Sequence, residues 1–199
     1  MKKLIIVSFL MMAFSGYSMN MAAKLVHSIR SSKTPVTINS VKGFRAAELG
    51  SLARSGRVVI AFTPGPWKPE DPLFPRTAWM ANPKALGCTP ELNALMDNIA
   101  YLNAKIYNVN THSDEYQRGE EGLLSLKGYR DMESISDAQG TLQSELGLES
   151  FAVASNQYLA RVTVAFNDQG EGRVFQLKSP VTPEDAVTHV REIRQFFDE

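Results

Sequence analysis

The sequence contains one cysteine, Cys88, and three scattered histidines, His27, His112 and His189. A single cysteine cannot form a disulfide within its own chain, and these few side chains match no ligand spacing for a structural metal site. Cys88 is therefore a buried inert thiol, a reactive thiol or a link to another molecule. We interpret the histidines as surface residues, and single out His112 because it follows a predicted strand.

The chain also lacks an excess of charge, because its 21 Lys and Arg residues balance 21 Asp and Glu residues. This balance does not favour a nucleic-acid partner or a cationic one. A glycine-rich phosphate loop, a dinucleotide-binding fingerprint and a serine nucleophile elbow are absent from the sequence. We therefore expect no cofactor and no bound metal. Hydrophobic residues make up 44% of the 199 residues, which suits one domain with a packed core.

Long hydrophobic runs are absent except at the N-terminus. There, two lysines precede the apolar residues 4–14, and the small residues Gly16 and Ser18 follow at the spacing of a signal-peptide cleavage site. The run is shorter than the roughly 20 residues that a transmembrane helix needs. We predict a signal peptide over residues 1–18 and hence a periplasmic or secreted protein, with an uncleaved membrane anchor as the alternative.

After a polar lead-in over residues 19–34 with a short helical tendency, strand and helix patterns alternate. Strands are predicted where short runs are apolar and β-branched, and helices where apolar residues recur at helical spacing. The expected strands are residues 36–41, 57–62, 105–109, 159–166 and 173–177, and the expected helices are residues 44–53, 90–102, 115–126, 141–146 and 183–197. Alternation implies parallel strands, and the turn at 167–170 adds an antiparallel hairpin. The sequence therefore predicts an α/β protein of the thioredoxin-like fold, with a central mixed sheet flanked by helices on both faces.

Proline is concentrated in one segment, since six of the ten prolines lie between Pro64 and Pro83, interleaved with aromatic residues. Proline lacks a donor N–H and fixes φ, so regular secondary structure cannot persist there. We predict a Pro-rich insertion over residues 65–86 within one thioredoxin-like domain spanning residues 35–199. A plain packed loop is the first interpretation, and a lid or a partner surface are the alternatives.

Cys88 stands immediately before the predicted helix that begins at Thr89, Pro90 and Glu91. A helix N-terminus stabilises a thiolate through its dipole and its free backbone N–H groups, and the thiolate is the nucleophilic form of cysteine. This placement favours a reactive thiol. The alternative is a buried cysteine that acts as a small hydrophobic side chain.

The segment 87–92 (GCTPEL) resembles the peroxidatic site of the peroxiredoxins, most closely the GCTxE pattern of their bacterioferritin-comigratory branch. As in that family, it comes after a buried strand ending in Phe62-Thr63-Pro64. The family's following strands, loops and turns are resembled by residues 105–113 (KIYNVNTHS), 133–140 (ESISDAQG), 142–148 and 161–170 (RVTVAFNDQG). The resemblance covers most of the chain from about Pro35, and it implies the thioredoxin-like fold.

The resemblance implies a one-cysteine thiol peroxidase that reduces hydrogen peroxide or small organic hydroperoxides. The Cys88 thiolate would attack the O–O bond and become a sulfenic acid, while Arg161 would favour the thiolate and polarise the peroxide. Glu91 would hold local hydrogen bonds by pairing with an arginine, and Thr89 and Pro64 would support the site. Without the resemblance, Arg161 is a solvated residue at a strand edge and Glu91 compensates the helix dipole.

One departure from the family pattern bears on activity. The family pattern Pro-x-x-x-Thr-x-x-Cys has a threonine hydroxyl three residues before the cysteine, where this sequence has Ala85. The family's proline corresponds either to Pro64, followed by a long excursion, or to Pro83 in a shortened turn. Thr63 or Thr77 would have to fold back to supply the hydroxyl.

The resemblance also leaves the sulfenic acid of Cys88 without a second cysteine to resolve it. Turnover would need an external thiol or a protein reductant, or two copies of Cys88 could link a homodimer. The main alternative function is a peroxiredoxin-like protein without efficient peroxidase activity, acting as a binding or redox-sensing module through its remodelled loop. A purely structural thioredoxin-fold module is the third.

Overall fold

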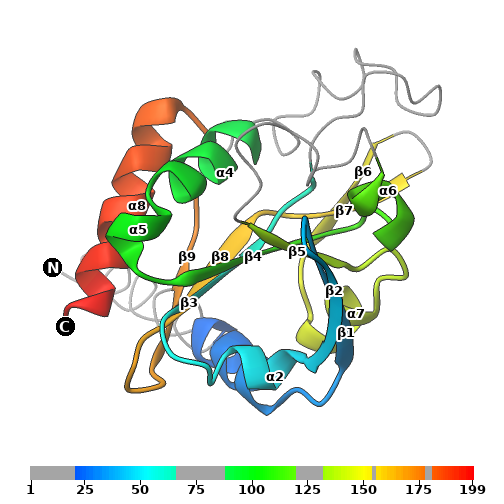
Figure 1. The fold of residues 1–199 in the computed structure, drawn as a ribbon, viewed down its shortest axis with the longest axis horizontal. Helices are drawn as coiled ribbons and strands as arrows, with labels where there is room; N and C mark the ends of the chain where they lie inside the picture. The colour runs from blue at the N-terminus through cyan, green and yellow to red at the C-terminus, as the bar shows by residue number, and fades with distance from the viewer. Residues whose placement is uncertain (1–20, 66–87, 120–131, 154–155, 178–180) are drawn as a thin grey trace, which may run out of the picture.

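The computed structural model describes residues 21–65, 88–119, 132–153, 156–177 and 181–199 (Figure 1). The described strands are β1 (Pro35–Ser40), β2 (Gly43–Glu48), β3 (Val58–Phe62), β4 (Lys105–Asn110), β5 (Glu133–Ser136), β6 (Ser150–Val153), β7 (Asn156–Leu159), β8 (Val162–Phe166) and β9 (Gly172–Phe175). The described helices are an N-terminal helix over residues 21–31, α2 (Leu49–Leu52), α4 (Cys88–Asp97), α5 (Ile99–Leu102), α6 (Asp114–Arg118), α7 (Thr141–Leu146) and α8 (Pro183–Phe197).

Seven of these strands form one mixed sheet in the order β2-β1-β5-β4-β3-β8-β9, and β6 and β7 form a separate hairpin. Strand β3 pairs in parallel with β4 and antiparallel with β8. It thus lies in the interior of the sheet, and all five of its residues are buried. This confirms the strand predicted from the short β-branched run.

The side chains of β3 alternate between two hydrophobic cores, one on each face of the sheet. Val58, Ile60 and Phe62 pack into the first core, with the N-terminal helix, α2 and α7. Val59 and Ala61 pack into the second core, with α4, α5 and α8. Figure 1 shows these two groups of helices on opposite sides of the sheet. The predicted mixed sheet with helices on both faces is confirmed.

Strand β2 corrects the prediction of a helix over residues 44–53. The chain turns at residues 41–42, Gly43 takes a φ of +126°, and β2 returns antiparallel to β1. Only the four-residue α2 is helical in this stretch. Because β2 is an edge strand with five of its six residues exposed, its side chains carry no alternation of apolar and polar residues that would identify a strand.

Several other elements differ from their predicted bounds, most clearly two helices and one strand. The helix predicted over residues 90–102 is divided at Asn98, whose Nδ2 donates to the Ala94 carbonyl at 2.8 Å, so that α4 ends and α5 begins there. Helix α6 ends before Gly119, and the rest of the helix predicted over residues 115–126 lies outside the described residues from 120 onward. The strand predicted over residues 159–166 is divided, because Leu159 is the last residue of β7 and β8 begins at Val162.

Helices α7 and α8 have their predicted bounds, and the predicted hairpin turn at residues 167–170 is present. Helix α7 ends at Gly147 in the left-handed conformation, and the turn at residues 167–170 joins β8 to β9. Helix α8 begins with a capping box in which the Thr182 Oγ1 accepts a hydrogen bond from the Asp185 N–H at 3.1 Å. Its predicted apolar face is buried against the second core.

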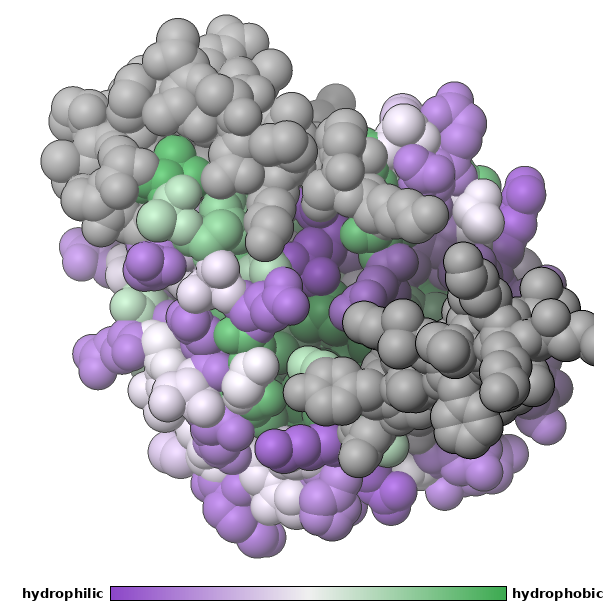
Figure 2. Space-filling model, turned by 180° about the vertical axis from the view of Figure 1, so that it is seen from behind, coloured by the Kyte–Doolittle hydropathy of each residue, from purple (hydrophilic) through white to green (hydrophobic). Residues whose placement is uncertain are grey.

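The predicted signal peptide and the Pro-rich insertion, apart from Gly65, lie outside the described residues. None of the helices in the described ranges is long and apolar enough to cross a membrane. Seen from behind, the described surface shows apolar residues gathered toward its middle and hydrophilic residues along its lower rim (Figure 2).

Candidate active site

An ion pair between Glu91 and Arg161 lies buried where α4 meets the start of β8. Arg161 Nε is 2.7 Å from Glu91 Oε2, and the two side chains are 2% and 0% exposed. Thr163 Oγ1 donates a hydrogen bond to Glu91 Oε1 at 2.8 Å. Both oxygens of the carboxylate are therefore engaged by residues at the start of β8.

Strand pairing positions Arg161 at the end of β3. Val162 is the partner of Phe62 in the antiparallel register of β8 and β3. Arg161, the residue before Val162, therefore lies at the level of Thr63. The chain leaves the sheet at this point, immediately before Pro64. The expectation of a solvated Arg161 at a strand edge does not hold, because the side chain is buried.

Helix α4 begins at Cys88, so the cysteine is the first helical residue and not the residue immediately before the helix. The side chains of Cys88 and Thr89 lie outside the described part of the chain. Glu91 comes three residues after Cys88, and residues at this spacing lie on the same side of a helix. The ion pair therefore brings the Arg161 guanidinium to the first turn of α4.

The environment of Glu91 changes its acidity. Burial raises the pKa of the Glu91 carboxyl to about 7, although the Arg161 charge and the hydrogen bonds from Thr163 and Arg161 lower it. A buried carboxylate is costly to ionise unless it is paired. Above this pKa the pair holds a carboxylate against a guanidinium in a buried environment of low polarity, where their attraction is strong.

His189 corrects the prediction of a surface histidine. It lies on α8 at 2% exposure, and its Nε2 is 3.8 Å from Glu91 Oε1. Its ring packs edge-on against Phe175, with 5.9 Å between the ring centroids. Burial, and then the charge of Arg161, lower the pKa of His189 to about 4. The helical spacing contained the signal, because residue 189 falls on the predicted apolar face between Ala186 and Val190.

The free energy of unfolding should depend on pH because His189 is buried in its neutral form. The unfolded chain takes up a proton at His189 below about pH 6.5, but the folded chain does so only near its pKa of about 4. Acidification through this window therefore destabilises the native protein through His189, by up to about 1.4 kcal/mol per pH unit. The raised pKa of Glu91 has the opposite effect between about pH 4.5 and 7, because the folded state then binds the extra proton.

His189→Gln removes only the histidine contribution. We expect the destabilisation that it causes to shrink as the pH falls from 6.5 to 4, as measured by urea unfolding of both proteins across this range. Ile193→Val, on the same buried face of α8, changes no titratable group and should show the same loss at every pH. A pH-independent difference for His189→Gln would contradict a neutral buried imidazole.

Thr63, one of the two candidates for the missing hydroxyl, already has hydrogen-bond partners. Its Oγ1 donates to Asn108 Oδ1 at 2.8 Å and accepts from the Gly65 N–H at 3.2 Å, and the residue is fully buried. Asn108 Nδ2 is buried without a hydrogen-bond partner among the described residues. Thr77 and Ala85 lie outside those residues. The sequence analysis did not single out Asn108. An asparagine inside a predicted buried strand could have indicated it, because a buried polar side chain needs hydrogen-bond partners.

His112 packs against the segment that leaves β3. A Cβ placed on Gly65 would lie 2.5 Å from His112 Cδ2, and Gly65 has a φ of +87°, so only glycine fits there. The His112 carbonyl accepts hydrogen bonds from Gln117 Nε2 at 3.0 Å and from Ser136 Oγ at 2.8 Å. His112 is half-buried beside Gly65 and is not a plain surface residue.

Within the described ranges, no three His, Cys, Asp or Glu side chains are grouped so that they could hold a metal ion. The described side chains that meet at this end of the sheet lie beside α4, the helix that starts at Cys88. They are the Arg161 guanidinium, the Glu91 carboxylate, the Thr163 hydroxyl and the neutral His189 imidazole. Such a set can stabilise negative charge and donate hydrogen bonds to it.

The solved structures of similar fold include peroxiredoxins. Peroxidoxin BcpB from Mycobacterium tuberculosis has a TM-score of 0.55 and 17% identity, over 84% of this chain and 94% of that one. AhpC from Enterococcus faecalis has a TM-score of 0.55 and 14% identity, over 85% and 93%. The bacterioferritin comigratory protein of Xanthomonas campestris has a TM-score of 0.50 and 20% identity, over 82% and 92%. No family model and no curated protein matches the sequence.

The fold is therefore the thioredoxin-like fold that the sequence predicted. More particularly, it is the form of that fold found in peroxiredoxins, and the similarity extends over more than four-fifths of the chain.

Proposed function

We propose that this protein is a one-cysteine thiol peroxidase that reduces hydrogen peroxide or small organic hydroperoxides through Cys88. The observation that carries the proposal is the buried ion pair between Arg161 and Glu91. Glu91 lies in the first turn of α4, the helix that begins at Cys88. The peroxiredoxin fold supports it, since one protein of similar fold, the bacterioferritin comigratory protein of Xanthomonas campestris, has alkyl peroxide reduction activity.

The Cys88 thiolate would attack one oxygen of the peroxide, and the O–O bond would break as the S–O bond forms. Cys88 becomes a sulfenic acid, and the other oxygen leaves with a proton as water or an alcohol. Arg161 carries a permanent charge and a guanidinium with five N–H donors, which suits it to favour the thiolate and to stabilise the leaving oxygen. Glu91 and Thr163 would hold the guanidinium in position.

Regeneration would use reductants from outside the chain. A first thiol would condense with the sulfenic acid to give a mixed disulfide and water, and a second thiol would release Cys88 and carry away the disulfide. An external small thiol or a protein reductant fits this role. Alternatively, the Cys88 thiol of a second copy in a homodimer would condense with the sulfenic acid to give a disulfide and water, and external thiols would then reduce that disulfide. The signal peptide predicted over residues 1–18 supports a periplasmic or secreted location for this chemistry.

The test is the second-order rate constant for oxidation of Cys88 by hydrogen peroxide and by an organic hydroperoxide, with Cys88→Ser as the blank. We expect a rate far above that of a free thiol, with sulfenic acid trapped at Cys88 and identified by mass spectrometry. Arg161→Lys keeps the charge but loses the fork of donors, and should lower the rate roughly a hundredfold. The matched control Arg173→Lys changes an exposed arginine paired with Glu199 and should leave the rate unchanged.

A second candidate, a binding or redox-sensing module without efficient turnover, is favoured by one observation. Thr63 Oγ1 donates its proton to Asn108 and so is not available to replace the hydroxyl that Ala85 lacks. A rate no better than that of a free thiol, in a folded protein, would overturn the peroxidase and support this candidate. Fast formation of the sulfenic acid that no thiol or reductant reverses would support the sensor.

A further inference from the structure

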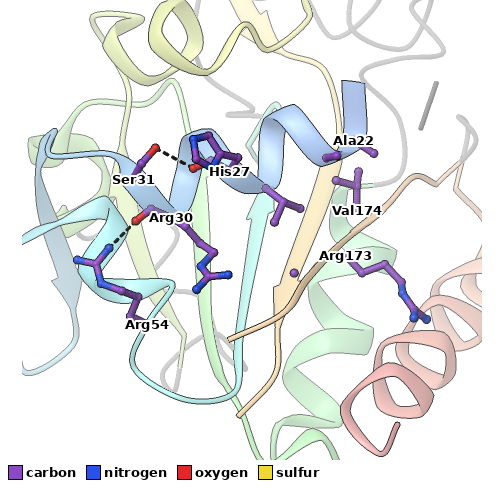
Figure 3. A pocket seen from close by; sticks show the side chains of 10 residues that line it. Ala22, His27, Arg30, Ser31, Arg54, Arg173 and Val174 are labelled. Carbon is purple, nitrogen blue, oxygen red and sulfur yellow. Dashed lines mark hydrogen bonds between the residues drawn. The ribbon is translucent and has the colours of Figure 1, made fainter. Parts of the chain in front are cut away.

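A groove of about 760 Å³ lies between the N-terminal helix and β9 (Figure 3). The helix packs on the first core through Ile29, so the groove opens on the face of the sheet opposite α4 and α8. It is therefore separate from the candidate active site. Its volume falls within the range of about 300–1,000 Å³ that is typical of small-molecule sites.

The groove has an apolar floor. Ala22 and Val26 line it from the helix, and Val174 lines it from β9. Val26 and Val174 are only partly buried where they pack against the first core. Gly172 lets the helix approach the strand this closely, because a Cβ at this position would lie 2.5 Å from Val26 Cγ1. The floor is thus built by direct contact of helix and strand.

Two guanidinium groups supply positive charge without a matching acid. Arg30 extends along the groove, and Arg54 Nη1 donates a hydrogen bond to the Arg30 carbonyl (Figure 3). No Asp or Glu of the described residues lines the groove, and within the described ranges neither arginine has an ion-pair partner.

This lack of partners contrasts with other arginines of the described chain. Arg57 pairs with Asp168 at 2.8 Å, and Arg173, at the far side of the groove, pairs with Glu199. In a chain with a formal net charge of zero, two guanidinium groups without an ion-pair partner among the described residues make the lining of this groove attractive to anions.

We propose that this groove binds a monoanionic amphiphile, such as a medium-chain carboxylate. Its head group would accept hydrogen bonds from Arg30, because a guanidinium matches a carboxylate in a two-pronged geometry, and the positive charge of Arg54 would add to the attraction. Its alkyl chain would lie over Val26 and Val174. Charge selects the head group and the apolar floor selects the tail, so neither a short anion nor an uncharged chain satisfies both.

The experiment is calorimetric titration of the purified protein, its N-terminus defined by mass spectrometry, with decanoate below its micelle concentration. We expect saturable binding at one site, about tenfold weaker for octanoate because two methylenes are lost, and no binding of acetate. Arg30→Gln should weaken decanoate binding at least about tenfold, since it removes a charged hydrogen-bond donor. Decanol should bind as weakly as decanoate binds to that variant.

Lys24→Gln is the matched control, because it removes one positive charge from an exposed position of the same helix that does not line the groove. It should leave the decanoate affinity within a factor of two. Three results would overturn the proposal: no saturable binding to the folded wild type, equal losses in both variants, or acetate binding as tightly as decanoate. Binding only to vesicles of an anionic phospholipid would also overturn it, and would indicate a membrane surface as the ligand. None of these outcomes depends on Cys88 or on peroxidase activity.

Discussion

Glu91→Leu is expected to lower the free energy of unfolding by about 3–5 kcal/mol, as measured by urea unfolding at pH 8. At that pH, above the pKa of about 7, the Glu91 carboxyl is ionised in the native state. The substitution leaves the Arg161 guanidinium, only 2% exposed, without its carboxylate, and it removes the acceptor of the Thr163 hydroxyl. An uncompensated buried charge and an unsatisfied hydroxyl both destabilise the folded state.

The double variant Glu91→Leu/Arg161→Met distinguishes the loss of the ion pair from the cost of leaving one buried charge without a partner. If the large effect comes from the charge left behind, removing both charges should be much less destabilising than the sum of the two single substitutions. Glu199→Leu is the control, because it breaks the exposed pair with Arg173 and should leave the unfolding midpoint almost unchanged. Additive single effects would show that the two side chains are not coupled in the native state.

Phe62→Ala should destabilise the protein by about 3–5 kcal/mol through loss of a buried ring and the cavity that remains. Phe62 is fully buried in the interior strand β3, where it packs into the first core. Phe44→Ala makes the same chemical change on the edge strand β2, where the ring is 69% exposed. That ring lies under the Arg118 guanidinium, 5.2 Å from its carbon, so this variant should lose only about 0.5 kcal/mol.

Thermal and urea unfolding of the two variants measure the difference directly. Phe62 also precedes the segment of Thr63 and Pro64, so its removal should loosen the end of β3 that faces Arg161. Similar losses for Phe62→Ala and Phe44→Ala would contradict the two-core arrangement, because burial is the main difference between the two positions.

Elements with a strong periodic pattern were predictable from the sequence. The five buried residues of β3 form a continuous apolar run, and α8 shows four apolar positions at helical spacing after a proline and a capping threonine. The turn at 167–170 has the composition of a hairpin. In each case the local pattern and the tertiary environment favour the same structure, so the local sequence alone was sufficient to predict the element.

The edge strand β2 was not predictable in the same way. It is held by backbone pairing to β1 and leaves most of its side chains in solvent, so no hydrophobic alternation identifies it. The prediction for His189 was wrong for a related reason. Histidine is usually found near the surface, and only the packing of α8 over α4 buries this one beside Glu91.

The fold class, the two-faced sheet and the position of Cys88 at a helix start all follow from the amino-acid sequence, because they depend on residue periodicity and on residues close together in the chain. Which side chains meet depends on the tertiary structure. Glu91 and Arg161 are far apart in sequence, and they pair because α4 and the start of β8 converge at the end of β3. The groove with Arg30 and Arg54 likewise exists only because the N-terminal helix lies across β9. Contacts between distant segments depend on the packing of whole elements, and a local pattern does not specify that packing.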